Sequence, residues 1–437
     1  MQSPSTPLPA TSASTTPGSS TPGIGFIIVL GSITFLGPLS IHLFFPVMPE
    51  VGKALSISPA LVGLTFSVTL FVMAFITLVY GSLSDRLGRR PVLLTGLTLF
   101  TLGGVLSSFA GSVTGLIVGR VIQALGAGCS ATLTRAIAHD AYGSEKLVKI
   151  IAYLTMAYTF GPMVAPLVGG VLIDAFGWRS AFWLSSVAGV AILFASWRMI
   201  HETHDAAHRR KQAGAAGSGG DGNSSAARRL RRDYRSLLRQ PRFLAFVLQT
   251  GFSTGTFLAM ASGASFLMKD YLGRSATEFG LYFLFFPIGF FLGNLVSSRL
   301  SQRVPVETMV LAGSTIMLLG NAVQGWLILD GMMVPLLLFI PGFVTTFAQG
   351  IALPNAQAGA IRVDPKLTGT ASGIGVFFQM FLGALCSQIY ALLSDGSALP
   401  MVLTVTCAAL LTFAAGVTPW LLRQRERAAT RAASALH

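Results

Sequence analysis

Twelve apolar stretches, each long enough to cross a lipid bilayer as a helix, constrain this chain more than any other feature. A spanning helix needs about 20 mostly apolar residues, because the hydrocarbon core is about 30 Å thick. Backbone N–H and C=O groups in lipid must pair within their own segment, which favours helices. The stretches lie near residues 24–46, 60–80, 91–110, 114–136, 147–172, 179–200, 242–268, 279–298, 308–329, 332–355, 369–393 and 398–422. The sequence therefore predicts an all-α membrane protein with twelve transmembrane helices.

The composition excludes an ordinary soluble fold and argues against several kinds of active site. Hydrophobic residues make up 52% of the chain and charged residues only 11%, whereas soluble domains average about 25% charged residues. No Gly-x-x-x-x-Gly-Lys-Ser/Thr phosphate-binding loop occurs. The histidines within 201–208 lack the His-Glu-x-x-His spacing of zinc proteases, and the three cysteines form no metal or disulfide pattern. We therefore expect no enzyme activity, no metal, no cofactor and no ATP hydrolysis by the chain itself.

The distribution of basic residues explains the net charge of +14. In a soluble protein that charge would suggest a nucleic-acid partner. If both termini are cytoplasmic, however, all but five of the 30 Lys and Arg residues fall in cytoplasmic segments. The exceptions are Lys53, Arg179, Lys269 and Arg274, which fall outside, and Arg120, which lies within a span. This asymmetry follows the positive-inside rule and predicts a multi-pass membrane protein with both termini cytoplasmic, surrounded by lipid and not bound to nucleic acid.

Two polar stretches and the chain ends divide the sequence into five parts. Residues 1–23 are rich in Ser, Thr and Pro and are expected to form a disordered tail. Residues 24–200 and 242–422 would each form a six-helix half, joined by a cytoplasmic linker over 201–241 that contains a Gly/Ser/Ala segment and a basic cluster. Residues 423–437 would form a basic C-terminal tail.

The loop after the second stretch carries a motif with fixed spacing. It contains one acid, two glycines and three arginines, at Gly81, Asp85, Arg86, Gly88, Arg89 and Arg90. This pattern resembles the signature loop between the second and third helices of the major facilitator superfamily, whose members are secondary transporters with twelve helices. The alternative is a hydrophilic turn that only obeys the positive-inside rule. In the family, this loop acts in cytoplasmic gating, and Asp85 would bind the start of the eleventh helix near Thr370 to Ser372.

An internal repeat supports the same family. After the eighth stretch, the order of the first loop up to Pro91 is repeated by Gly293, Leu295, Arg299, Arg303 and Pro305, with two inserted residues and without the acid. Parallel six-helix repeats related by an axis along the membrane normal are a known transporter architecture. The resemblance therefore implies the major facilitator fold, with two six-helix halves.

Further segments resemble one branch of the family, the bicyclomycin and chloramphenicol resistance (Bcr/CflA) drug-efflux transporters, from residue 24 to residue 422. The segment 119–128 is similar to the fourth-helix arginine motif of proton-linked members. A fifth-helix antiporter motif is carried by Gly161, Pro162, Pro166, Gly169 and Gly170. Prolines remove helix hydrogen bonds and small residues allow close helix contact. We expect this helix to pack between the halves, with Gly289 and Gly293 as its partners, although general membrane-helix packing also explains such glycines.

The first helix departs from the branch at one position. Where the branch usually has Ser-Ile-Asp-x-Tyr-x-Pro, this chain has His42 in place of the Asp and Phe44 in place of the Tyr. The remaining acids lie in loops or at the ends of spans. The residue that would ordinarily carry the proton is therefore missing.

Two ionisable residues lie well inside spans, His42 and Arg120. A charge at the centre of a spanning helix costs about 2.5–3.5 kcal/mol, so such residues usually face a cavity. Counting along the helices places both at a similar depth. We expect them to line a substrate cavity, with His42 titrating and Arg120 favouring its neutral form by like-charge repulsion. The simpler alternative for His42 is a structural hydrogen bond to a backbone carbonyl.

The sequence thus favours a monomeric secondary active transporter that exports small drug-like or metabolite molecules, through proton antiport and alternating access. One alternative is an uncoupled facilitator or exporter of an anionic metabolite, held by Arg120 and His42. A receptor on the same scaffold is a second alternative, but Asp85 and Arg120 are both present.

Overall fold

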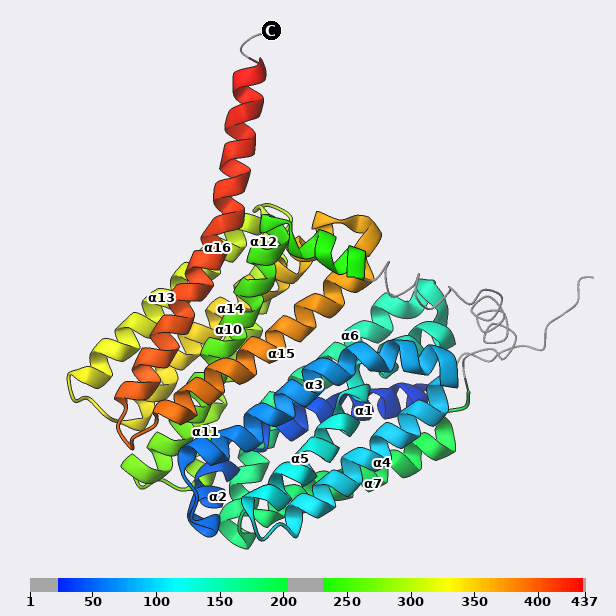
Figure 1. Ribbon diagram of the computed structural model, residues 1–437, viewed down its shortest axis with the longest axis vertical. Coiled ribbons are helices and arrows are strands. Elements are labelled where there is room, and N and C mark those ends of the chain that lie inside the picture. Colours follow the sequence, from blue (N-terminus) through cyan, green and yellow to red (C-terminus); the bar gives the residue numbers. More distant parts are fainter. Residues whose placement is uncertain (1–22, 203–230, 435–437) are drawn as a thin grey trace, which may run out of the picture.

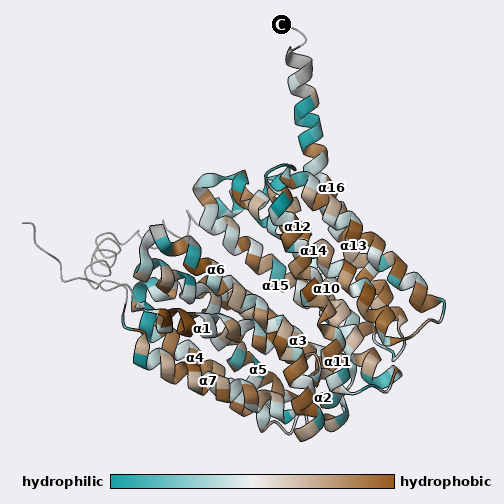
Figure 2. Cartoon of the chain, turned by 180° about the vertical axis from the view of Figure 1, so that it is seen from behind, coloured by the Kyte–Doolittle hydropathy of each residue, from teal (hydrophilic) through white to brown (hydrophobic). Residues whose placement is uncertain are grey.

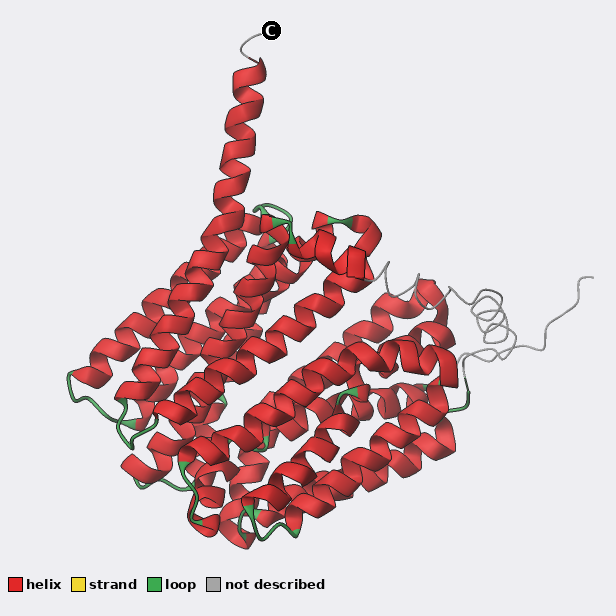
Figure 3. Cartoon of the chain, viewed as in Figure 1, coloured by secondary structure: helices red, strands yellow, loops and turns green. Residues whose placement is uncertain are grey.

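A computed structural model describes residues 23–202 and 231–434 of the chain. Within these ranges the regular elements are helices (Figure 3). The helices in these ranges form twelve spans that are long and apolar enough to cross a membrane, as the sequence predicts. Apolar residues run along the helices, and polar residues gather at the helix ends (Figure 2). The expected N-terminal tail and most of the linker lie outside the described residues.

Within residues 23–202 the N-terminal half contains seven helices, and all but the short second helix contribute to its six spans. They are α1 (Ile24–His42), α2 (Val47–Leu55), α3 (Pro59–Leu87), α4 (Arg89–Ser108), α5 (Val113–Ala127), α6 (Cys129–Phe176) and α7 (Arg179–Met199). The long helix α6 is interrupted at Gly143, whose φ of 65° is left-handed and suits glycine. The part of α6 before Gly143 completes the fourth span together with α5, and the part after it forms the fifth.

The C-terminal half follows the same plan. Its helices are α10 (Pro241–Phe266), the π-helical turn η1 (Leu267–Tyr271), α11 (Ala276–Phe283), α12 (Phe285–Leu300), α13 (Val306–Leu329), α14 (Pro335–Val363), the 3-10 turn η2 (Pro365–Leu367), α15 (Thr368–Leu393) and α16 (Leu399–Ser434). Helices α11 and α12 together form the eighth span. Residues 231–238 are also helical. Beyond the bundle, α16 continues as a projecting helix (Figure 1).

The same helix pairings occur in both halves. Helix α1 packs on α6, and its counterpart α10 packs on α15. The pairs α4–α5 and α4–α7 in the first half correspond to α13–α14 and α13–α16 in the second. The halves meet through α3 against α15 and α6 against α11, which are also corresponding pairs (Figure 1). The chain therefore has the two six-helix halves that the internal repeat indicated.

The two ends of the molecule differ in how closely the halves approach. At the end that contains α2, η1 and α11, here called the clasped end, Glu50 pairs with Lys269 at 2.6 Å and Lys53 with Asp270 at 2.9 Å. At the opposite end, where α1 begins and α16 leaves the bundle, a Cβ atom on Gly81 or Gly369 would meet nothing within 4 Å. We call this the terminal end.

Candidate functional site

A cleft of about 830 Å³ lies between the two halves, partly open to solvent. Both halves line it, with side chains from α1, α3 and α6 on one side and from α10, α12, α14 and α15 on the other. Besides the imidazole of His42, its polar lining consists of hydroxyl and amide groups, among them Thr159, Thr254, Thr346, Gln349 and Gln379. Aromatic and apolar side chains make up most of the rest, including Tyr158, Phe257, Phe286 and Phe290. No Asp, Glu, Lys or Arg is among the described residues that line it.

His42 lies where this cleft approaches the clasped end. Its ring packs among the rings of Phe45, Phe257 and Phe283, with centroids 5.8, 6.1 and 6.3 Å away. Nδ1 lies 3.1 Å from the carbonyl oxygen of Pro38. A carbonyl can only accept, so this contact assigns the hydrogen of a neutral ring to Nδ1 and leaves Nε2 to take up a proton. The backbone hydrogen bond of the simpler alternative is thus present, and the same side chain also lines the cleft.

Thr254 supplies a buried polar group that has no partner among the described residues. Its side chain is 7% exposed, and Oγ1 has no hydrogen-bond partner among the described residues. A buried hydroxyl that stays unpaired destabilises the folded state. Because Thr254 lines the cleft, a bound molecule can provide the missing hydrogen bond.

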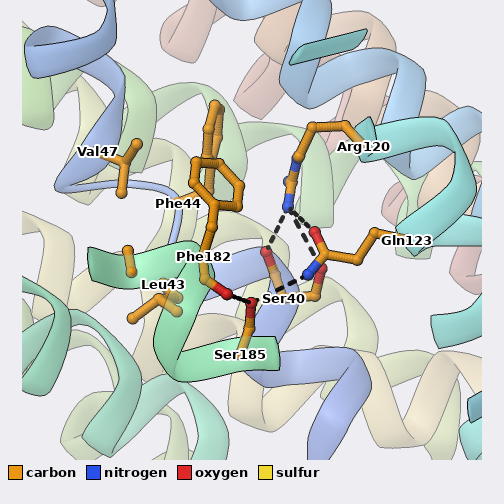
Figure 4. Close-up of a pocket in the computed structure, with 9 residues that line it drawn as sticks. Ser40, Leu43, Phe44, Val47, Arg120, Gln123, Phe182 and Ser185 are labelled. Carbon is orange, nitrogen blue, oxygen red and sulfur yellow. Dashed lines mark hydrogen bonds between the residues drawn. The ribbon is translucent and has the colours of Figure 1, made fainter. Parts of the chain in front are cut away.

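Arg120 lies in a second, smaller pocket of about 200 Å³ inside the N-terminal half (Figure 4). The residue is 1% exposed. Nη1 donates to the carbonyl oxygen of Ser40 at 3.3 Å, to Ser40 Oγ at 3.4 Å and to Gln123 Oε1 at 3.0 Å. The guanidinium carbon lies 4.4 Å from the centre of the Phe44 ring, a cation–π distance. Phe44 stands where the branch that this sequence resembles usually has Tyr, and its ring packs on this arginine.

Close packing between α4 and α5 fixes the position of Gln123. A Cβ atom on Gly103 would lie 2.1 Å from the Gln123 backbone nitrogen, and one on Gly126 would lie 2.2 Å from the Phe100 nitrogen. The Gln123 amide in turn donates from Nε2 to Ser185 Oγ at 3.2 Å, which directs Oε1 towards Arg120 (Figure 4). Gly126 of the fourth-helix motif and Gly103 of α4 thus hold the two helices together and orient the group that binds the arginine.

The structure does not bring His42 and Arg120 together. Successive residues of a helix are about 100° apart, so His42 lies on the face of α1 opposite to that of Ser40. Ser40 contacts Arg120 in the small pocket, while His42 lines the cleft between the halves. Similar depth along the helices, which the sequence indicated, does not place two side chains on the same face.

The loop motif makes its polar contacts with the N-terminal half and with Glu202 at the start of the linker. Arg89 binds Asp85 at 2.6 Å and Asp140 at 3.1 Å, and its backbone N–H donates to Glu202 at 3.0 Å. Arg90 donates to the carbonyl oxygen of Trp197. Gly88, with a φ of 104°, joins α3 to α4, while Gly81 and Arg86 complete the motif at the terminal end. The ion-pair partner of Asp85 in this conformation is therefore Arg89, on its own loop, rather than the start of α15.

The antiporter-motif helix packs against α1 and α11. A Cβ on Gly161 would lie 2.3 Å from Pro38 Cβ, and one on Gly170 would lie 2.2 Å from the carbonyl oxygen of Ala276. Gly169 similarly faces Leu43, and Pro162 lines the cleft.

The prediction that Gly289 and Gly293 are the packing partners of this helix is wrong. Gly289 and Gly293 pack against Phe343 and Phe347 of α14, within their own half. Pro166 instead faces Gly280 of α11, where a Cβ would lie 2.6 Å from the Pro166 carbonyl oxygen. Both candidates belong to the eighth span, and spacing alone does not distinguish them.

The clasped end contains functional candidates that sequence reasoning missed. Besides the two ion pairs between α2 and η1, Asp174 of α6 accepts hydrogen bonds from the backbone N–H groups of Ala276 and Thr277, at 3.2 and 2.8 Å. Lys53 and Lys269 are two of the four basic residues that do not follow the positive-inside asymmetry. Their presence on the sparsely charged side was the signal that they have specific partners.

Comparisons with known proteins agree with this fold. The sequence model of the Major Facilitator Superfamily matches residues 30–387. A bicyclomycin resistance protein homolog of Haemophilus influenzae is 25% identical over 87% of this chain and 92% of its own length. The multidrug resistance protein MdtL of Shigella dysenteriae is 29% identical over 58% of this chain and 61% of its own. In fold, a D-xylose-proton symporter superposes with a TM-score of 0.71 at 14% identity, over 89% of this chain and 97% of its own.

Proposed function

This chain belongs to the Major Facilitator Superfamily, and from that premise we propose that it exports uncharged, partly aromatic drug-like or metabolite molecules by proton antiport. The observation that carries the proposal is the cleft between the halves. Its lining combines aromatic rings with hydroxyl and amide groups and has no fixed charge among the described residues. Such a surface suits ligands that bind through apolar contact and a few hydrogen bonds. Relatives named for bicyclomycin and multidrug resistance support the same class of substrate.

His42 carries the exchanged proton in this proposal. An imidazole titrates between pH 5 and 8 more readily than any other side chain. Support comes from its position in the cleft and from its Nδ1 contact with Pro38, which leaves Nε2 as the proton acceptor. Protonation would place a positive charge among the rings of Phe45, Phe257 and Phe283 at the junction of the halves. Substrate and proton would thus compete for one cleft, which is the requirement for antiport.

Alternating access then exchanges the contacts at the two ends. With the clasped end closed, as here, substrate enters the cleft from the terminal end. In the opposite state the ion pairs at the clasped end break, and Asp85 leaves Arg89 to bind the N-terminus of α15 near Thr370 to Ser372. A carboxylate at such a position contributes about 0.3–1 kcal/mol when exposed. The basic terminal end faces the cytoplasm of the bacterial inner membrane in this proposal, so both termini are cytoplasmic.

The alternative, export of an anionic metabolite, receives less support from the geometry. Arg120 would have to hold the anion, and Arg120 lies in the small pocket on the other face of α1. An uncoupled facilitator of neutral molecules differs from the proposal only in its response to a pH gradient.

Two measurements test the proposal. A panel of uncharged and anionic compounds is screened for resistance in an efflux-deficient bacterium that expresses the chain, and compounds that score are then followed in proteoliposomes with and without a pH gradient. We expect uncharged aromatic compounds to score and their accumulation to follow the gradient. Selective transport of anions would support the metabolite alternative, and gradient-independent transport would support the facilitator.

A further inference from the structure

Arg120 is a buried cation that has no counter-charge among the described residues. Its residue is 1% exposed, and no carboxylate of the described residues forms an ion pair with it. An arginine remains protonated in proteins, so burial does not remove the charge by deprotonation. A buried charge that lacks both a partner and a full set of hydrogen bonds is strongly unfavourable. The pocket therefore requires a source of negative charge that the described protein residues do not supply.

The contacts of the guanidinium are concentrated on one edge. Nη1 donates to Ser40 and Gln123, and the Phe44 ring covers one face at 4.4 Å. Nε and Nη2 have no hydrogen-bond partner among the described residues, although both are buried. Nε and Nη2 lie on the same edge of the planar guanidinium. This edge commonly binds an anion in a forked geometry. Arg120, whose Nε and Nη2 have no partner among the described residues, lines the small pocket (Figure 4).

The size and position of the pocket limit what it can hold. The pocket has about 200 Å³ of space against about 830 Å³ for the cleft, and both volumes include space that is open to solvent. The pocket lies within the N-terminal half, and its lining shares no residue with that of the cleft. A small inorganic ion fits these limits, whereas a drug-like substrate does not.

We propose that this pocket binds a small monovalent inorganic anion, with chloride as the abundant candidate, on Nε and Nη2 of Arg120. The ion neutralises the guanidinium inside the N-terminal half and remains there while the halves move. It is a structural ligand of α1 and α5, separate from the transported molecule and from the proton on His42. The site stands independently of the transport proposal, because its occupancy is measured without transport.

Thermal unfolding of the purified full-length protein in detergent tests this site. Chloride is titrated against gluconate at constant ionic strength, since gluconate is too large for the pocket. We expect the unfolding midpoint to rise with chloride along a saturating curve, by roughly 2–5 °C at about 100 times the dissociation constant. A midpoint that responds equally to both salts would overturn the proposal.

Two variants and a control locate the effect. Gln123→Glu places a carboxylate at the position that lies 3.0 Å from Nη1, so an internal counter-charge replaces the ion and the chloride response should disappear. Arg120→Met removes the cation and should also lose the response. Arg274→Ala, which removes an arginine that pairs with Glu278 near the protein surface, should keep it. A wild-type chloride response in Gln123→Glu would contradict the assignment.

Bromide provides a direct readout, and it decides the matter if Arg120→Met does not fold. Crystals of the wild-type protein grown in bromide should show anomalous density beside Nε and Nη2 of Arg120, and crystals of Gln123→Glu should not. Wild-type crystals without bromide density in this pocket would rule out the site.

Discussion

The cleft between the halves and the pocket of Arg120 lie on opposite faces of α1, and they differ in how they treat charge. The cleft is lined by aromatic, hydroxyl and amide groups, with a single imidazole and no fixed charge among the described residues. The pocket holds a permanent cation within one bundle. A surface that must separate and close again in each cycle is compatible with groups that are neutral or can become neutral. A fixed charge is tolerated where the surrounding helices do not move apart.

The two cavities also differ in how tightly the residues around them are packed. Around Arg120, glycines bring the backbones of α4 and α5 into contact, so that a Cβ on Gly103 would lie 2.1 Å from a backbone nitrogen. In the cleft, by contrast, the hydroxyl of Thr254 is unpaired within the part of the chain that the structure describes. Substitutions near the pocket should therefore affect stability, and substitutions in the cleft should affect binding and transport.

The largest effect is expected for a substitution between α4 and α5, next to the pocket of Arg120. Gly103→Ala should lower the free energy of unfolding by about 2–3 kcal/mol, because its Cβ overlaps the Gln123 backbone, which has no flexible end to move. Gly375→Ala is the matched control, since it is also within a helix but meets nothing within 4 Å. That control should be neutral or stabilising by up to about 1 kcal/mol. Thermal unfolding compares the two, and equal midpoints would show that α4 and α5 are not rigidly packed.

A smaller effect is expected in the cleft. Thr254→Val removes the unpaired hydroxyl with little change in shape, so stability without substrate should not fall. Substrate affinity should fall by about 2–10-fold, which corresponds to one hydrogen bond of about 0.5–1.5 kcal/mol. Binding titrations and unfolding midpoints of the same preparations measure both quantities. A loss of stability with unchanged affinity would reverse the roles that we assign to the two cavities.

The smallest effect is expected at the clasped end, whose ion pairs are partly exposed. Such pairs contribute about 0.2–1 kcal/mol each. Asp270→Lys should shift the population towards opening at that end by about 2–5-fold, and adding Lys53→Asp should restore the original population because the pair is re-formed with reversed charges. Spin labels on α2 and η1 report the distance between the halves. Failure of the double variant to restore it would mean that the pair does not act as a clasp.

Much of this architecture could be predicted from the sequence, because hydrophobic length and charge placement act locally. The count of twelve spans follows from runs of apolar residues, and the division into halves follows from the repeated loop. The rotation of each helix about its axis depends on neighbours that are distant in sequence. For that reason His42 and Arg120 were expected to meet, and Gly289 rather than Gly280 was expected to face α6. The Glu50–Lys269 pair joins residues from different halves, and no local pattern identifies it.

The central claim is that proton exchange occurs in the cleft at His42 and not at Arg120. The most direct test is uptake of an exported compound by proteoliposomes under an imposed pH gradient, with wild type and His42→Ala compared at equal protein. We expect His42→Ala to bind the compound but to lose all dependence on the gradient, and His42→Asp to regain that dependence with a more acidic profile. Gradient-driven transport by His42→Ala at the wild-type rate would contradict the account, because the proton would then be carried elsewhere.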